Sequence, residues 1–168
     1  MRVINMPNDE HQKTIIVQGL GRCKMKQIVD KDPFYLADVE SLPEIWPTEK
    51  EAEDPMFKAL TQTFFEESIK FIQYNENIPN EAVYAINEIT NRFVKCNFIC
   101  TSLPFTAEDK IKMLEQEKLS ERLIEALKAL HMELKLLYLQ NEIRNKTQFD
   151  LDVQQKEYYL KQQIKNIK

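Results

Sequence analysis

Two cysteines spaced four residues apart are the side chains of this 168-residue chain whose types and spacing first suggest chemistry. Cys96 and Cys100 fall one turn apart on a predicted helix, so their thiols can meet on one face. The pair could bind a metal or act as a redox couple, or it could be two buried thiols that pack as small hydrophobic groups. Cys23 makes the number of cysteines odd, and no C-x-x-C occurs. We favour the packing interpretation and a reducing compartment.

Other residues that could act as nucleophile or base are scattered along the chain. His11 falls in a predicted loop and His131 in a leucine-rich helix, without H-E-x-x-H or another metal-ligand spacing. Ser68 and Lys70 stand two apart on a predicted helix, so their side chains diverge. With only two glycines, neither a phosphate loop nor a dinucleotide fingerprint can be drawn. We expect no catalytic, cofactor-binding or metal-binding residue, and no enzyme activity, in this chain alone.

Aromatic side chains are the second kind of candidate. Most have the spacing of a helix core, but Phe64 and Phe65 are adjacent, so one of the two could be exposed. The cluster comprises Trp46, Phe57, Phe64, Phe65, Phe71 and Tyr74. Exposed aromatic rings are a common means by which a domain binds unfolded or partner chains. The candidate substrate or partner contacts are Trp46, Phe65, Tyr158, Tyr159 and Leu160.

Charge and hydropathy exclude several classes of function. Charged residues make up 30% and hydrophobic residues 43% of the chain, which is typical of a soluble globular protein. No apolar run reaches the ~18 residues that a membrane span needs, and the N-terminus has no signal-peptide pattern. The net charge is −4, and the acidic excess between residues 30 and 67 argues against a nucleic-acid module. We expect a cytoplasmic protein without membrane or nucleic-acid partners.

The N-terminal third has β character. Short runs at residues 14–18, 23–28 and 34–40 are β-branched or alternate apolar with polar residues, which predicts three strands in an antiparallel meander. Alone, such a sheet would have two exposed edges. Two prolines in the segment 42–47 predict a linker from this sheet to a helical region.

Helical periodicity begins at Thr48 and continues in segments separated by proline. We expect helices at 48–74, 81–89 and 91–103, and one that opens with a capping box at Thr106–Asp109. The fold class is therefore α+β, mainly α, with a remnant antiparallel β subdomain, a helical bundle and a long C-terminal helix. The expected division is 1–45, 46–118 and 119–168.

The last helix is predicted to run from Ser120, as N-cap, to Lys168 without glycine or proline. A 49-residue helix would extend ~73 Å. Leucines at 123, 127, 130, 134 and 137 step by four and three, a short coiled-coil-type seam that we expect to pack on the preceding helices. Beyond Leu139 the apolar pattern thins, so the distal half should be exposed. The pattern shows no closing signal, and we expect the helix to lead toward a further domain.

Two segments of the N-terminal third, residues 17–25 (VQGLGRCKM) and 32–40 (DPFYLADVE), have a distinctive order of residue types. They resemble the V-x-G-L-x-R and P-(F/Y)-x-x-A-x-(V/A)-E patterns in the N-terminal domain of Lon proteases. Residues 78–81 look like its K-I-P-x-E, with Asn77 in place of the lysine. Further similar positions are Leu103-Pro104, Lys110, Glu115, 121–123, 142–144 and, most specifically, 155–165 (QKEYYLKQQIK). Departures are the segment 147–150 and Gln162, where the family has glutamate.

The resemblance implies a fragment of an ATP-dependent serine protease that joins an N-terminal domain to an AAA+ ATPase and a protease domain with a Ser-Lys dyad. ATP and Mg would be bound in the ATPase domain, and the whole enzyme would work as a hexamer in protein quality control. This fragment would recognise unfolded or damaged substrates and support the hexamer. The alternative is an architectural or oligomerisation module that couples the N-domain to the ATPase and has little substrate affinity of its own.

Overall fold

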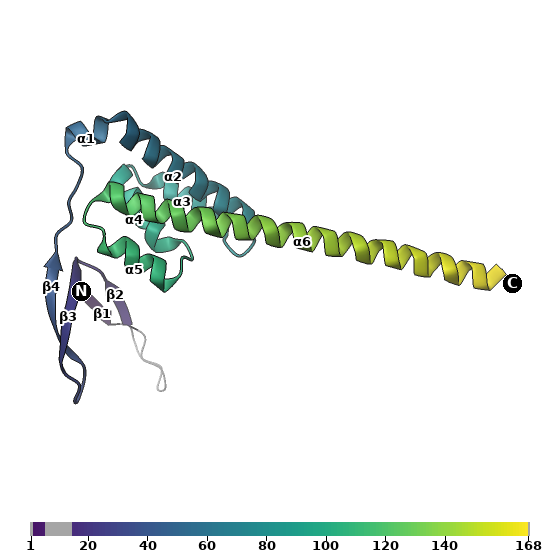
Figure 1. Cartoon of the computed structure of the whole chain (residues 1–168), viewed down its shortest axis with the longest axis horizontal. Coiled ribbons are helices and arrows are strands. Elements are labelled where there is room, and N and C mark those ends of the chain that lie inside the picture. The colour runs from purple at the N-terminus through teal and green to yellow at the C-terminus, as the bar shows by residue number, and fades with distance from the viewer. Residues whose placement is uncertain (1, 6–14, 168) are drawn as a thin grey trace.

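The computed structural model describes residues 2–5 and 15–167. Two β-ladders precede a bundle of helices, and one very long helix extends from the bundle (Figure 1). The expected class, α+β and mainly α with a long C-terminal helix, is confirmed. The helices are α1 (Glu49–Glu53), α2 (Pro55–Tyr74), α3 (Glu81–Glu88), α4 (Arg92–Ser102), α5 (Ala107–Glu115) and α6 (Leu119–Ile167).

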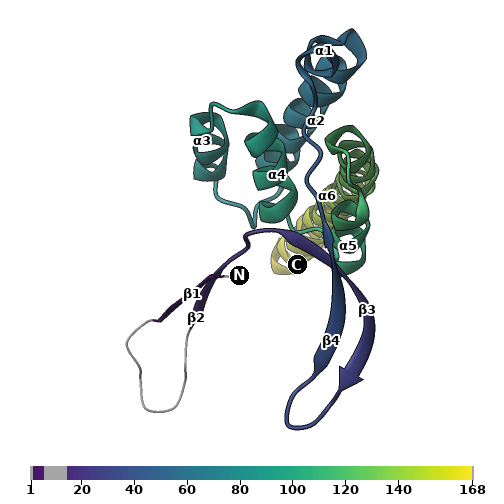
Figure 2. The same cartoon turned by 90° about the vertical axis from the view of Figure 1, so that its left-hand side faces the viewer.

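The strands form two separate antiparallel pairs, so the predicted three-stranded meander is wrong. β1 (Arg2–Asn5) pairs with β2 (Ile15–Gln18), and β3 (Arg22–Asp30) pairs with β4 (Leu36–Leu42). Tight two-residue hairpin turns require positive φ, and neither Gly19 nor Gly21 adopts it. The chain therefore leaves β2 and begins a new ladder at β3, and the two hairpins diverge (Figure 2).

The predicted helix from Thr48 to Tyr74 is divided at Asp54. Thr48 caps α1 in a full capping box with Glu51. Asp54 precedes a proline, which disfavours helical backbone at that position, and its ψ is 130°. The Asp54 carboxylate then accepts hydrogen bonds from the first amides of α2. The helix boundary is therefore set by the Asp54-Pro55 dipeptide.

The core lies where α2 and α6 run side by side, with α4 and α5 closing it (Figures 1 and 2). Phe64, Leu123 and Leu130 are completely buried there. The predicted leucine seam is confirmed: Leu123, Leu130 and Leu134 are buried, and Leu127 and Leu137 are partly buried and pack against the core. Tertiary packing of this seam, rather than helix propensity, holds the first half of α6.

The helix α6 begins at Leu119, so Ser120 is not its N-cap. The amide of Arg122 donates to the carbonyl of Lys118, which places Lys118 at the N-cap position. The distal half has the predicted exposure, because every residue from 142 to 167 is exposed. No finding tests the division into 1–45, 46–118 and 119–168, which stays a prediction.

Candidate functional site

The cysteine pair sits inside the core of the bundle. Cys96 and Cys100 are free and buried on the inner face of α4. Burial raises the pKa of both thiols to about 12. A thiol in this state is a poor nucleophile and a poor metal ligand, so the geometry agrees with the packing interpretation. Within the residues that the structure describes, no three His, Cys, Asp or Glu side chains gather as a metal cluster.

The other polar candidates are held apart as the spacing predicts. The Ser68 hydroxyl donates to the Phe64 carbonyl at 2.6 Å inside the core, whereas Lys70 extends over the ring of Tyr138. His131 is an exposed residue of α6 whose Nε2 lies 4.0 Å from a carboxylate oxygen of Glu67. His11 lies outside the described residues. Among the described residues, Ser68, Lys70 and His131 do not form a nucleophile–base constellation.

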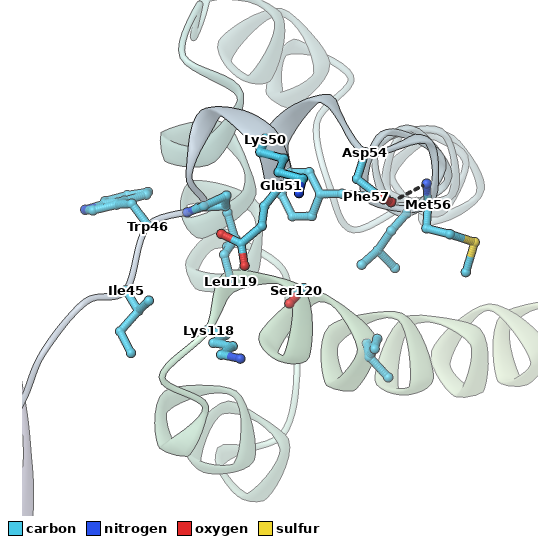
Figure 3. A pocket seen from close by; sticks show the side chains of 13 residues that line it. Ile45, Trp46, Lys50, Glu51, Asp54, Met56, Phe57, Lys118, Leu119 and Ser120 are labelled. Atoms are coloured by element: carbon cyan, nitrogen blue, oxygen red, sulfur yellow. Dashed lines mark hydrogen bonds between the residues drawn. The ribbon is translucent and has the colours of Figure 1, made fainter.

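A groove lies at one end of the bundle. It has a volume of about 710 Å³ and lies between the linker after β4, the α1–α2 corner and the first turns of α6 (Figure 3). Eight apolar side chains line it: Ile45, Trp46, Pro47, Met56, Phe57, Leu60, Leu119 and Ile124. We call this surface the Trp46 groove.

The floor and the rim of the Trp46 groove differ in exposure. Phe57 and Leu119 are buried and form part of the core. Met56 is 80% exposed, and Trp46 and Ile124 are each 45% exposed. The groove thus continues the hydrophobic core outward to an open apolar rim, a combination that marks interaction surfaces.

The linker after β4 forms one wall of the groove, and two kinds of contact hold it: packed aromatic rings and a backbone hydrogen bond. The Trp46 ring lies 6.0 Å from the ring of Phe93, which meets Phe57 edge-on at the same centroid distance. The Ile45 amide donates to the Glu117 carbonyl at 3.4 Å, beside a parallel bridge to Lys118. The linker wall is therefore tied both to α4 and to the start of α6.

The acids of the groove are committed to helix caps. The Glu51 carboxylate accepts hydrogen bonds from the amide and hydroxyl of Thr48, both at 2.9 Å, and these bonds lower its pKa. Asp54 accepts from the Met56 amide at 2.8 Å, the bond drawn in Figure 3. With Lys50 and Lys118, these groups give the apolar groove a polar rim. Such a rim suits binding rather than proton transfer.

The five predicted contact residues do not come together in one site. Trp46 lines the groove. Phe65 does not: it is half-buried, with Lys95 5.4 Å above its ring, while Phe64 fills the core. Tyr158, Tyr159 and Leu160 lie on the exposed distal part of α6. Their proposed contacts remain predictions.

Sequence reasoning missed two rim residues. Met56 keeps the spacing of the α2 core positions, but it is the most exposed of the large apolar side chains that line the groove. It stands in the first turn, directly after Pro55, and the chain of α1 does not cover it. Ile124 follows Leu123 of the seam and is therefore out of phase with it. An apolar residue out of phase with a buried stripe is the signal that could have located this rim.

Comparison with known proteins assigns the chain to a family. Residues 1–163 match the family described as the ATP-dependent protease La (LON) substrate-binding domain. The chain belongs to the Lon substrate-binding domain family. It is 35% identical to the Lon protease of Flavobacterium johnsoniae over 99% of this chain and 20% of that protein. It is 34% identical to the Lon protease of Porphyromonas gingivalis over 99% of this chain and 19% of that protein.

This Lon-family chain spans about a fifth of the length of the curated relatives that it matches. The Trp46 groove lies within the residues that match the substrate-binding-domain family. Among the helices in residues 49–167, none combines the length and apolarity that crossing a bilayer requires.

Proposed function

We propose that this chain is a non-catalytic recognition module of an ATP-dependent serine protease and that it binds exposed apolar segments of unfolded or damaged proteins. The observation that carries the proposal is the Trp46 groove, whose buried floor opens to a rim of exposed apolar side chains. Unfolded proteins differ from folded ones in displaying apolar segments. A groove that receives such segments selects unfolded chains without reading a defined sequence.

The composition of the rim suits many different segments. Tryptophan is enriched among the residues that dominate binding energy at interfaces, and methionine adapts its shape to different partners. The groove lies between helices, where an apolar segment of a substrate can contact side chains from the linker, α2 and α6 together. The family description, a substrate-binding domain, supports the same assignment.

Binding of a permanently unfolded protein tests the proposal. We would titrate fluorescein-labelled, reduced and carboxymethylated α-lactalbumin with the chain and measure anisotropy. Met56→Ser and Ile124→Ser should weaken binding, because both side chains belong to the groove rim. Met132→Ser is the matched control, since Met132 is a 69% exposed methionine on α6 outside the groove. Absence of binding at high micromolar concentration, with the chain folded, contradicts the proposal, as does equal binding by all variants.

An architectural role is the second candidate, and the exposed distal part of α6 favours it. Tyr158, Tyr159 and Leu160 stand exposed on a helix that emerges from the bundle. In the whole protein these residues would contact other subunits or domains of a cytoplasmic hexamer, whose ATPase domain would hold ATP and Mg. Sedimentation of the whole protein with Tyr159→Ala tests this role. An unchanged hexamer with unchanged proteolysis would count against it.

A further inference from the structure

Two arginines hold one carboxylate at the junction between the β3–β4 hairpin and the helices. Arg122 donates from Nη1 to Glu44 Oε1 at 2.7 Å and from Nη2 to Glu44 Oε2 at 3.3 Å. Arg22 Nη2 lies 3.0 Å from the same Oε2. Arg122 is buried, and the side chains of Arg22 and Glu44 are only 12% and 26% exposed. Charge pairs that are shielded from solvent in this way are much less screened than surface pairs. We call the three residues the Glu44 joint.

The remaining hydrogen bonds of the Glu44 joint connect segments that are far apart in sequence. Arg22, the first residue of β3, donates to the carbonyls of Leu114 and Gln116, both at 2.7 Å, at the C-terminal end of α5. Arg122, in the first turn of α6, shares the Gln116 carbonyl at 2.9 Å and donates to Asn97 of α4 at 2.8 Å. The joint thus ties β3 and the linker to α4, α5 and α6.

Among the residues that the structure describes, the β3–β4 hairpin has few other contacts with the helices. Every residue from Cys23 to Ser41 is exposed, and in Figure 2 the β3–β4 hairpin extends away from the helices. The backbone contacts of Ile45 with Glu117 and Lys118 lie directly beside the joint. Because the hairpin is attached at the Glu44 joint and the adjacent Ile45 contacts, it can rotate relative to the helices only if these contacts break.

The same linker forms one wall of the Trp46 groove. Glu44 belongs to the joint, and the three residues that follow it, Ile45, Trp46 and Pro47, line the groove. Glu44 and Trp46 are only two residues apart, so a change in the position of Glu44 displaces the segment that carries Trp46.

We propose that the Glu44 joint is a mechanical link that fixes the β3–β4 hairpin against α6 and, through the linker, holds the wall of the Trp46 groove in place. The joint is a positioning device and contributes no ligand contact. Its action does not require that the groove bind a substrate. Breaking the joint frees the hairpin and loosens the groove wall together, while the helical core stays folded.

Distance measurement by pulsed electron paramagnetic resonance tests the first half. Nitroxides are attached at Lys31→Cys on the hairpin and Lys135→Cys on α6 in a Cys23→Ser background, where the buried Cys96 and Cys100 escape labelling. With the joint intact, the two nitroxides should give one narrow distance distribution. Arg22→Gln and Glu44→Gln should broaden that distribution. Glu40→Gln is the control, since Glu40 pairs with Lys26 on the exposed hairpin, outside the joint.

Fluorescence of Trp46, the single tryptophan of the chain, tests the second half. Its ring is 45% exposed while the joint is intact, so quenching by acrylamide should roughly double when the wall is released. Arg22→Gln leaves the Arg122–Glu44 pair in place, so it should broaden the distribution and keep the wild-type quenching. Glu44→Asp, which keeps the charge but shortens the reach of the carboxylate to both arginines, decides the question if Glu44→Gln fails to fold by circular dichroism. The proposal is overturned by a broad wild-type distribution, by a folded joint variant that keeps the narrow distribution, or by a folded Glu44 variant that keeps the wild-type quenching.

Discussion

Arg122 and Glu44 form a bidentate ion pair across 78 residues of sequence. Arg122 is a buried residue in the first turn of α6. Removing one partner of such a pair leaves an uncompensated charge in a poorly solvated place. The cost of breaking this pair therefore comes mainly from the unpaired charge that remains, and less from the lost attraction between the two side chains.

Arg122→Ala should lower the free energy of unfolding by about 3 kcal/mol, because Glu44 and the carbonyls at the end of α5 lose the hydrogen bonds that Arg122 donates to them. The measurement is the urea midpoint followed by circular dichroism. Arg144→Ala is the matched control on the same helix. Its partner Glu76 and its own side chain are exposed, so its midpoint should equal that of the wild type. Equal shifts in the two variants would contradict the role of burial.

Leu130→Ala should cost about 3 kcal/mol of unfolding free energy, since it opens a cavity at a fully buried position of the leucine seam. Leu139→Ala removes the same atoms from a half-exposed position of α6 and should cost less than about 0.5 kcal/mol. Thermal unfolding of the two variants side by side gives the comparison. A similar loss in both would mean that the seam does not end before Leu139.

Alkylation should modify Cys23 alone in the folded chain. Cys23 is exposed, whereas burial raises the pKa of Cys96 and Cys100 to about 12. Iodoacetamide at pH 8, read by mass spectrometry, should add one group to the native protein and three after unfolding in urea. Three additions without denaturant would show that the α4 face opens readily.

The same two thiols should make stability fall at high pH. In the unfolded chain they ionise near the ordinary value of 9.0, while in the folded chain they keep their protons up to about 12. The folded state therefore binds more protons between these values, and the free energy of unfolding decreases as pH rises through that window. Urea midpoints of the wild type and Cys100→Ala at pH 8 and pH 10 test this: the variant should lose less stability over that interval.

Ending the chain after Asn141 should leave the thermal midpoint unchanged, because every residue from 142 to 167 is exposed. Helical ellipticity should fall, since that segment is helical throughout. Ending the chain after Leu127 is the contrasting variant. It removes Leu130 and Leu134 from the core, and it should abolish cooperative unfolding. A lower midpoint for the first truncation would reveal a stabilising contact of the distal segment.

Local signals predicted the helices well. Residues close in sequence determine three features that the structure confirms: the end of α2 before Pro79, the capping threonine at 106 and the leucine seam. Local signals failed where pairing is non-local. The partner of β2 is β1 rather than β3, and a short strand pattern carries no information about which distant segment completes its ladder.

The Trp46 groove and the Glu44 joint were beyond sequence reasoning for the same reason. The groove walls come from the linker, α2 and α6, and the joint unites residues 22, 44 and 122. Each residue alone has an ordinary surface interpretation. Trp46 was predicted as a contact because it belongs to the aromatic cluster at residues 46–74, whereas nothing near Glu44 distinguishes it from the other acids of that segment.

Because α6 is one continuous helix, it acts as a long lever arm. Arg122 sits at the base, within the Glu44 joint, and Ile167 stands about 67 Å further along the axis at 1.5 Å per residue. A rotation of the base by about 5° would carry the tip sideways by about 6 Å, the scale of a whole helical turn. Because the first half of α6 is packed into the core, a small change in the tilt of the whole bundle is thereby magnified into a large sideways displacement of the exposed end of the helix.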